Sequence, residues 1–353
     1  MNGNIKIACL PVAGIGNPYQ HLMIKGLNES ELINAFNGVD DRFLGPIRTW
    51  YKYKPKFIHF DWIHSYYIRR TSWMSYFLLP LFILQVVFLN KMTSSKIVWT
   101  LHNLMPHNST NLFVNKFVRR FFANQCLWIR VFSENTIDEA SKLLKVSKHK
   151  IKVIPEGDYR LFYPNTISRA AARSFFKLRK EEKVFLYLGF IRPYKGIENL
   201  IYSFLKLKEE NIKLIIVGQN RDKKYVDSLK KNIKANATDK IIFKDNFIPN
   251  DDLQIYYNAC DIVVLPFEKV ENSGSVILAM GFKRPIIAPD LGVLNKRLQN
   301  QKKILYTDNL YGKLNEIIRF SNKELSEIGN LNFNFLDSFS WKDFSNEFIK
   351  HEE

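Results

Sequence analysis

Cysteine is scarce in this sequence, and its scarcity limits the redox setting and the metal chemistry of the protein. The three cysteines, Cys9, Cys126 and Cys260, lie far apart in a chain of 353 residues. They match no metal-binding spacing, and three scattered thiols predict a reducing compartment. No signal peptide is expected either, because residues 1–10 are a short polar start that runs directly into a strand. These absences favour a cytoplasmic protein.

Acidic residues are in deficit, and the resulting positive charge is unevenly distributed. The chain has 34 Asp and Glu against 52 Lys and Arg, a net charge of +18. Residues 1–165 hold 21 basic and 10 acidic residues, so +11 of this charge lies there and +7 in the remainder. The sequence has no helix-turn-helix, zinc-finger or aromatic RNA-binding motif, which argues against a nucleic acid partner. An anionic membrane surface attracts the same charge, with roughly 1 kcal/mol per basic residue.

Long uninterrupted apolar runs are missing too. The segment Thr71–Asn90 has twenty residues without a charge, but its strictly apolar part runs only from Tyr76 to Leu84 and contains Pro80. Three interpretations stay open: a buried helix leading into a strand at 96–100, a membrane span, or a helix lying in the membrane interface. The interfacial interpretation uses the residues at its start, Arg69, Arg70, Trp73 and Tyr76.

The pattern that is present is a regular alternation of short apolar strands and amphipathic helices. In the second half we predict strands at 184–188, 212–217, 240–243, 261–265 and 284–288, with helices at 197–207, 222–235, 250–259 and 274–282. The first half has predicted strands at 5–10, 56–60, 97–101, 128–132 and 151–154. Such alternation indicates an α/β fold with parallel, doubly wound sheets, and the length suits two domains.

Two cations follow the first strand of the second half. Gly189 ends this strand, and Arg192 and Lys195 come next, just before the helix predicted at 197–207. In an open parallel sheet ligands bind at the carboxyl ends of the strands, where helix N-termini also favour anions. A guanidinium and an ammonium here suit a diphosphate, although two solvated loop charges would give the same spacing.

A second candidate anion loop, Glu271–Ser275, lies between the strand at 261–265 and the helix that follows. Its hydroxyls and backbone N–H groups at a helix start are typical of a phosphate-binding loop. Ser273 also fits a simple helix N-cap. Glu271 repels phosphate, so its expected partner is a hydroxyl group instead. Gln219, after the strand at 212–217, is a candidate for the border of a base pocket.

The first half has polar residues at three strand ends. A glycine turn at 14–18, including Gly16, follows the first strand, and it is either a ligand loop or a turn that needs positive φ. His59, Asp61, Trp62 and His64 surround the end of the second predicted strand. Metal binding is one interpretation, but a sugar-acceptor site, where Trp stacks and Asp accepts hydroxyls, fits better. His102 follows the strand at 97–101, where an imidazole can bind a hydroxyl or take a proton.

These segments carry a family resemblance. RPYKG at 192–196 and ENSGSVILAMGFKRPIIAP at 271–289 resemble the donor half of a GT-B glycosyltransferase. They are closest to the family 4 enzymes of capsule and exopolysaccharide assembly, which include mannosyltransferase-like members. The resemblance extends upstream through KIVWTLHNLMPH, SENT and IPEGDYRLFYPN, so it covers about 57–289. The order of the blocks carries it, since each block alone is weakly specific.

The resemblance implies two Rossmann-like domains facing each other across a cleft. Residues 1–160 are the expected acceptor domain, 161–335 the nucleotide-sugar donor domain, and 336–353 a helix that returns to the first. The expected donor is UDP- or GDP-linked, and the expected acceptor is a glycan or a polyprenyl-diphosphate-linked glycan at the inner face of the membrane. No metal or cofactor is expected, since the sequence has no Asp-x-Asp.

The resemblance also implies roles for particular residues. His102 and Glu271 are the expected catalytic residues. Donor binding falls to Gly16, Arg192, Lys195, Gln219, Asn272, Ser273, Gly274 and Ser275. Acceptor binding falls to Asp61, Trp62 and His107.

Some positions depart from the family pattern. Ala279 stands where the family usually has a second glutamate that holds the ribose. Either other groups hold the ribose here, or the alignment is shifted and Glu268, rather than Glu271, matches the first glutamate of the family. His107-Asn108 replaces a His-Glu pair on the acceptor side. These departures keep two alternatives open, a nucleotide-sugar epimerase of the same fold and a catalytically silent scaffold.

Overall fold

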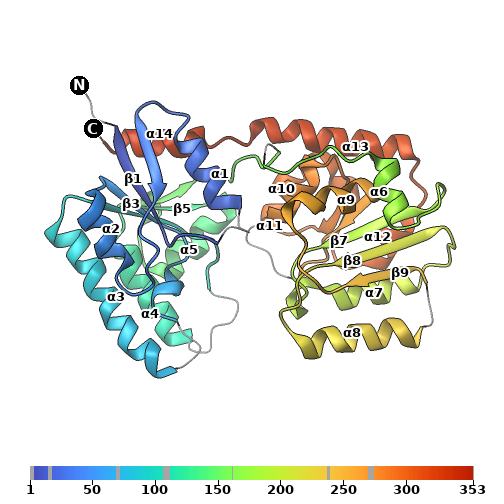
Figure 1. Ribbon diagram of the computed structural model, residues 1–353, viewed down its shortest axis with the longest axis horizontal. Helices are drawn as coiled ribbons and strands as arrows, with labels where there is room; N and C mark the ends of the chain where they lie inside the picture. Colours follow the sequence, from blue (N-terminus) through green and yellow to red (C-terminus); the bar gives the residue numbers. More distant parts are fainter. Residues whose placement is uncertain are drawn as a thin grey trace. The chain divides into compact units, whose positions relative to one another are not determined.

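The chain folds into two compact units, residues 1–157 with 339–353 (unit 1) and residues 158–338 (unit 2). The sequence places these boundaries at 160 and 335. In the computed structural model (Figure 1), the described residues are 4–14, 18–68, 72–105, 112–160, 162–236, 239–268 and 274–352.

Unit 1 contains a six-stranded parallel sheet in the order β2-β1-β3-β4-β5-β6. Its strands are β1 (Ile5–Leu10), β2 (Ile33–Asn37), β3 (Phe57–Phe60), β4 (Lys96–Thr100), β5 (Trp128–Val131) and β6 (Ile151–Val153). Its helices are α1 (Pro18–Leu27), α2 (Gly45–Tyr53), α3 (Ser72–Met92), α4 (Leu112–Gln125), α5 (Ile137–Leu144) and α14 (Lys342–Lys350).

Alternating strand residues supply the two faces of this sheet. One face carries Phe60 and Trp99, which pack in the core against Phe82 of α3 and Phe122 of α4. The other face is covered by α14, the last helix of the chain. Helices therefore cover both sides, as a parallel sheet requires.

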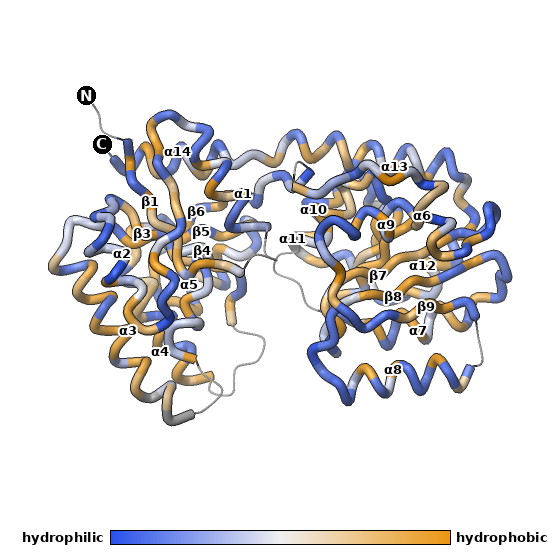
Figure 2. Tube along the Cα trace, viewed as in Figure 1, coloured by the Kyte–Doolittle hydropathy of each residue, from blue (hydrophilic) through white to orange (hydrophobic). Residues whose placement is uncertain are grey.

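The helix α3 accounts for the long uncharged segment of the sequence. Its inner side is buried in the core through Leu78, Phe82, Val86 and Leu89. Its outer side is also apolar, and Figure 2 shows α3 as a largely hydrophobic stretch. Within the described part of the chain, no helix combines the length and the hydropathy that a membrane span requires.

The α14 helix packs through aromatic side chains onto the sheet of unit 1. The ring of Phe344 lies 5.3 Å from that of His59 and 5.8 Å from that of Trp128. The guanidinium of the fully buried Arg130 lies 4.2 Å from the centre of the Phe344 ring. Residues far apart in sequence are thus joined in one core.

Unit 2 contains a second six-stranded parallel sheet, in the order β12-β11-β10-β7-β8-β9. Its strands are β7 (Lys183–Leu188), β8 (Ile212–Val217), β9 (Ile241–Lys244), β10 (Ile262–Val264), β11 (Ile286–Pro289) and β12 (Leu305–Tyr306). Its helices are α6 (Arg169–Phe175), α7 (Ile197–Leu205), α8 (Lys223–Ala235), α9 (Leu253–Ala259), α10 (Gly274–Gly281), α11 (Gly292–Arg297), α12 (Leu310–Ile317) and α13 (Asn322–Phe335). Its core gathers the apolar sides of β7, β8, α7 and α12.

The predicted strands all exist, with ends shifted by a few residues. The sequence analysis missed β2, β12 and several helices, including α1, α2 and α13. The β12 strand has two residues, which is too short to give a pattern. The α13 helix has a capping box, in which Ser321 and Glu324 bond each other's backbone N–H, and this signal was available in the sequence.

Phe344→Ala should destabilise unit 1 by roughly 3–5 kcal/mol, because it leaves a cavity among Trp128, His59 and Arg130. The measurement is urea unfolding followed by tryptophan fluorescence. The matched control is Leu32→Ala in unit 1, since Leu32 is 49% exposed and should change stability by less than about 0.5 kcal/mol. Equal losses from both variants would contradict the assigned role of α14.

Candidate functional site

In unit 2 the strand order reverses beside β7. The chain runs from β7 to β8 and β9 on one side, then returns to place β10 on the other side of β7. At such a reversal the loops after the two central strands diverge and leave a crevice at the strand ends. Arg192 and Lys195 follow β7, and Glu268 follows β10.

The two loops at this reversal lie directly against each other. The backbone N–H of Glu268 donates to the carbonyl of Tyr194 at 3.3 Å. Gly196 has φ +69°, and a Cβ there would lie 1.9 Å from the carbonyl oxygen of Pro266. Only glycine satisfies both constraints. The short 3₁₀ turn Pro193–Lys195 is therefore fixed between Arg192 and Gly196.

Lys195 is half-buried, with its ammonium 4.3 Å from the centre of the Phe267 ring. Burial, together with the charge of Arg192, lowers the pKa of Lys195 to about 8. The cost of holding two cations close together in a half-buried loop indicates that the loop favours an anion.

Other expected donor residues lie around these cations. Ser275, in the first turn of α10, has its Oγ 4.0 Å from the position that a Cβ on Gly189 would take. The backbone N–H of Ile191 donates to the carbonyl of Gln219 at 3.1 Å, which joins the loops after β7 and β8. Gly274 starts α10. The structure therefore places Gln219 and Ser275 beside the segment after β7 that carries Arg192 and Lys195.

Five of the predicted site residues lie outside the described residues. They are Gly16, His107, Glu271, Asn272 and Ser273. Glu268, the alternative to Glu271, is exposed at the end of the described segment.

In unit 1 the strand order reverses between β1 and β3. Asp61 immediately follows β3, and its backbone N–H donates to the carbonyl of Leu10 at the end of β1 at 2.8 Å. His102 follows β4, the next strand of the sheet. Three strand ends therefore place Asp61, Trp62 and His102 together.

The side chains of Asp61 and His102 form a direct contact. His102 Nε2 lies 2.8 Å from Asp61 Oδ1, and the Asp61 side chain has 0% exposure. The Asp61 side chain is therefore covered, and its contact with an acceptor hydroxyl stays a prediction. Trp62, the neighbouring acceptor candidate, is half-buried and stacks on His102 at 4.7 Å between ring centres.

The electrostatics around Asp61 favour the carboxylate. Burial opposes its ionisation, but His59, a hydrogen bond from His102 and the charge of Arg130 outweigh burial and hold the pKa of Asp61 below its ordinary value. His59 itself is fully buried and bonds Thr100 Oγ1 through Nε2 at 2.8 Å. Burial lowers the pKa of His59 to about 4, so its imidazole is neutral at pH 7.

A metal held by His59, Asp61 and His64 was the other interpretation of this region. Burial lowers the pKa of His64 to about 4 as well. Among the described residues, no three His, Cys, Asp or Glu side chains are grouped as a metal site requires.

Several residues of the unit 1 site had no signal in the sequence. Gln20, on α1, is buried, and its amide lies 3.4 Å from Asp61 Oδ2. Tyr19 packs edge-on against His102, with the ring centres 4.8 Å apart. Arg130 donates to the hydroxyl of Tyr19 at 3.0 Å. The local sequence pattern does not identify these residues, because only the order of the strands in the sheet brings them to the site.

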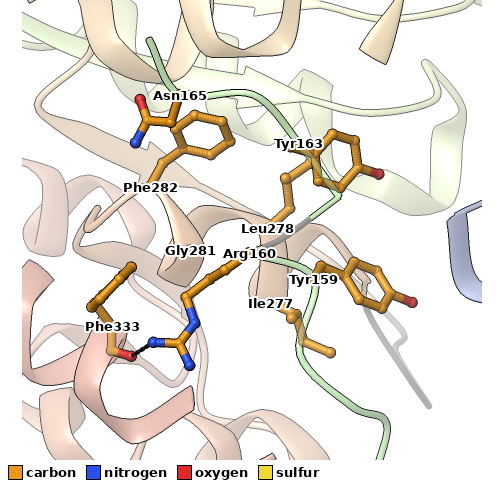
Figure 3. Close-up of a pocket in the computed structure, with 9 residues that line it drawn as sticks. All are labelled: Tyr159, Arg160, Tyr163, Asn165, Ile277, Leu278, Gly281, Phe282 and Phe333. Carbon is orange, nitrogen blue, oxygen red and sulfur yellow. Dashed lines mark hydrogen bonds between the residues drawn. The ribbon is translucent and has the colours of Figure 1, made fainter. Parts of the chain in front are cut away.

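Unit 2 also has a pocket of about 210 Å³. Figure 3 shows Arg160 pointing toward Phe333, whose carbonyl accepts its hydrogen bond. The pocket walls come from the linker, α10 and α13, and are formed by Tyr159, Arg160, Tyr163, Asn165, Ile277, Leu278, Gly281, Phe282 and Phe333. No residue expected to bind the donor or the acceptor lines it.

Residues 168–323, which make up most of unit 2, match the family described as glycosyl transferases group 1. Over these residues unit 2 is similar to group 1 glycosyl transferase domains. This match includes both loops of the strand reversal described above.

Curated relatives of the chain include sugar transferases. It is 24% identical over 203 residues to GDP-mannose:glycolipid 4-beta-D-mannosyltransferase of Xanthomonas campestris, which covers 56% of this chain and 51% of the relative. It is 29% identical over 171 residues to mannosylfructose-phosphate synthase of Agrobacterium fabrum, which covers 46% of this chain and 37% of that protein. The chain thus spans about half the length, or less, of these relatives.

Solved structures share the fold along the whole chain. Sucrose-phosphate synthase from Thermosynechococcus elongatus has a TM-score of 0.73 at 16% identity and covers 98% of both chains. Anabaena HepE in complex with UDP and glucose has a TM-score of 0.73 at 15% identity and covers 99% of both. These likenesses confirm the predicted fold class, the GT-B fold with two Rossmann-like domains.

The affinity of the protein for a diphosphate should fall as pH rises through about 8. Lys195 binds an anion when protonated, and above its pKa the cation is lost. From pH 7 to 9 we expect a loss of roughly tenfold in calorimetric affinity for UDP or GDP. Lys195→Arg keeps its charge in this range and should remove the slope. The same slope in the parent and in Lys195→Arg would contradict this assignment.

Proposed function

We propose that this protein transfers a sugar from a nucleotide-diphosphate donor to a hydroxyl of a glycan or lipid-linked acceptor. The observation that carries the proposal is the pair Arg192 and Lys195 on a fixed loop at the strand reversal of a domain similar to group 1 glycosyl transferases. The setting we propose is capsular or exopolysaccharide biosynthesis at the inner face of the membrane.

The chemistry follows from the leaving group. When the bond between the sugar and the diphosphate breaks, negative charge develops on the diphosphate. Preorganised cations stabilise this charge without reorganising during the reaction. Arg192 and Lys195 provide two such charges, and Ser275 and the first N–H groups of α10 add hydrogen bonds. This arrangement supplies leaving-group stabilisation from the protein itself, and we propose a metal-independent reaction.

Glu271 is the proposed contact to the donor sugar, and His102 the proposed group nearest the reacting carbon. For the nucleotide, we propose UDP or GDP. The relative from Xanthomonas is named for GDP-mannose and a glycolipid, and Anabaena HepE was solved with UDP-glucose, which supports both choices of nucleotide and a lipid-linked acceptor.

A thermal-shift screen of the full chain against UDP, GDP, UDP-glucose and GDP-mannose tests the proposal. Ligand at about 100 times its Kd adds roughly 2.7 kcal/mol of stability, which raises the melting temperature measurably. We expect one nucleotide series to stabilise the protein. No shift with any of the four, at millimolar concentration, would overturn the proposal.

Arg192→Ala should lower kcat/KM for nucleoside diphosphate release by roughly 10²- to 10³-fold, which corresponds to about 2.7–4 kcal/mol of lost transition-state stabilisation. The control is Lys230→Ala on α8, an exposed cation paired with Asp245, which should leave the rate unchanged. A near-normal rate for Arg192→Ala would contradict the assignment of the diphosphate site to this loop.

We also propose that unit 1 docks on an anionic membrane surface through α3 and α4. These helices pack on each other. Both expose large apolar side chains: Phe77 and Leu84 on α3, and Phe113 and Phe117 on α4. The first half of the chain holds +11 of the net charge. Exposed apolar residues next to basic ones favour an anionic membrane surface. Arg69 and Arg70, the basic residues expected here, lie outside the described residues.

The purified protein should sediment with vesicles containing phosphatidylglycerol and dissociate as salt rises, because charge attraction is screened over about 10 Å at 0.1 M salt. Phe113→Ser should weaken binding about tenfold or more, since one buried Phe contributes roughly 1.5–3 kcal/mol. Phe247→Ser, on an exposed residue of unit 2, is the matched control. Equal binding by both variants would contradict this docking surface.

A further inference from the structure

We propose that the pocket of unit 2 beside Arg160 and Phe333 is an effector site for a small uncharged aromatic molecule, whose binding strengthens nucleotide binding through α10. The pocket and its ligand class are independent of the proposed function. The effect on the nucleotide rests on that function, because it needs a nucleotide bound at the strand reversal of unit 2.

The pocket is large enough for a substituted aromatic ring. Its volume is about 210 Å³, whereas a cavity of about 150 Å³ with apolar walls already holds a benzene ring. The linker, α10 and α13 form its walls. All of its lining residues belong to unit 2, so the pocket is formed within one compact unit.

The walls are mostly aromatic and aliphatic. Of the nine lining residues, four carry aromatic rings and two are aliphatic. The ring of Phe282 is fixed, since it stacks on Tyr257 with the ring centres 4.7 Å apart and an interplanar angle of 6°. Figure 3 shows the hydroxyls of Tyr159 and Tyr163 directed to the same side, away from Phe333. Walls of this kind favour a planar, apolar ligand.

Of the described lining residues only Arg160 is charged, and its charge is already neutralised. Its Nε donates to Asp158 Oδ2 at 2.6 Å, and its Nη2 donates to Asp337 Oδ1 at 2.7 Å. Its Nη1 donates to the carbonyl of Phe333 at 3.4 Å. A guanidinium between two carboxylates gives an anionic ligand no advantage, and a charged group would lose its hydration in an apolar pocket. An uncharged ligand is therefore favoured.

Asn165 supplies a hydrogen-bond donor to the pocket. Its side-chain oxygen accepts from Asn258 Nδ2 at 2.8 Å. Asn258 is itself held by the carbonyl of Ile167 at 2.8 Å and by Arg284 Nη2 at 3.2 Å. Among the described residues, no acceptor takes the side-chain N–H groups of Asn165. They are available to a ligand oxygen, so the class we infer is an aromatic ring that carries a carbonyl group, as in an aryl amide.

The α10 helix connects the pocket with the expected donor site. Its second half lines the pocket, and its first two residues, Gly274 and Ser275, are expected to bind the donor. Tyr159, another lining residue, lies against the same helix start, since its Cε2 is 3.4 Å from the position that a Cβ on Gly274 would take. A ligand packed on Tyr159 and α10 would restrict both before a nucleotide binds, which lowers the entropy cost of nucleotide binding.

The ligand class is tested by NMR titration of the full chain with benzamide, benzoate and benzylamine. These share a ring and a size but are neutral, anionic and cationic at pH 7. We expect benzamide to bind at least about fivefold more tightly than the other two, because only they lose the hydration of a charge. Tighter binding of benzoate would overturn the uncharged class. No saturable binding of benzamide up to about 10 mM would overturn the site.

Gly281 provides a matched pair of variants that locates the binding. A Cβ there would lie 3.4 Å from Arg160 Cγ, which is an ordinary contact. Gly281→Ala should therefore keep the benzamide affinity within about threefold, whereas Gly281→Leu fills the pocket and should weaken it about tenfold or more.

Asn165→Ala tests the site independently of how well Gly281→Leu folds. Asn165 is exposed, and loss of its hydrogen bond should weaken benzamide binding about fivefold. Unchanged benzamide affinity in both Gly281→Leu and Asn165→Ala would overturn the location of the site.

The effect on the donor site is measured by titrating UDP and GDP with and without saturating benzamide. We expect the nucleotide affinity to rise about fivefold, and the benzamide affinity to rise by the same factor with saturating nucleotide. In Gly281→Leu, benzamide should leave the nucleotide affinity unchanged. An unchanged nucleotide affinity in the parent would overturn the effector role. Failure of the proposed function gives a different result: neither nucleotide binds, which overturns the effector role, while benzamide binding and its loss in Gly281→Leu still support the pocket assignment.

Discussion

The strand order of a parallel sheet is the constraint on which both sites depend. Each sheet starts in one direction and then returns to the other side of its first strand, so two loops diverge at the carboxyl edge. In unit 2 these loops carry Arg192, Lys195 and Glu268. In unit 1 they lead to Asp61, with His102 from the next strand. The strand order therefore brings together candidate residues that lie far apart in the sequence.

The two sites have opposite electrostatic designs. Unit 2 holds two cations on a loop that glycine geometry fixes, and burial beside Arg192 lowers the pKa of Lys195 to about 8. The two cations of the free loop therefore repel each other, and a bound anion would relieve this repulsion. Unit 1 buries a carboxylate and keeps it ionised through hydrogen bonds and nearby Arg130. One site favours negative charge in a ligand, and the other holds a buried negative charge of its own.

The sequence predicted the features that depend on residues close together along the chain. The strand, glycine, cations and helix of 184–207 are contiguous, so Arg192 and Lys195 could be found directly. The GT-B fold was predicted from the family resemblance. The Asp61–His102 contact could not be predicted, because it needs β3 and β4 to be neighbours in register. The contact between Gln20 and the Asp61 side chain could not be predicted either, because the two residues are distant in sequence. The two-residue strand β12 gave too little periodicity to detect, whereas β2 was missed although it is longer than β6, which was predicted.

The most direct measurement of the central claim is a crystal structure of the protein with UDP or GDP bound. The account predicts a diphosphate within hydrogen-bonding distance of Arg192, Lys195 and Ser275, at the strand reversal of unit 2. Such contacts are short and charge-assisted, and their lengths can be measured in the crystal structure. A nucleotide bound elsewhere, for example in the pocket beside Arg160 and Phe333, would contradict the account.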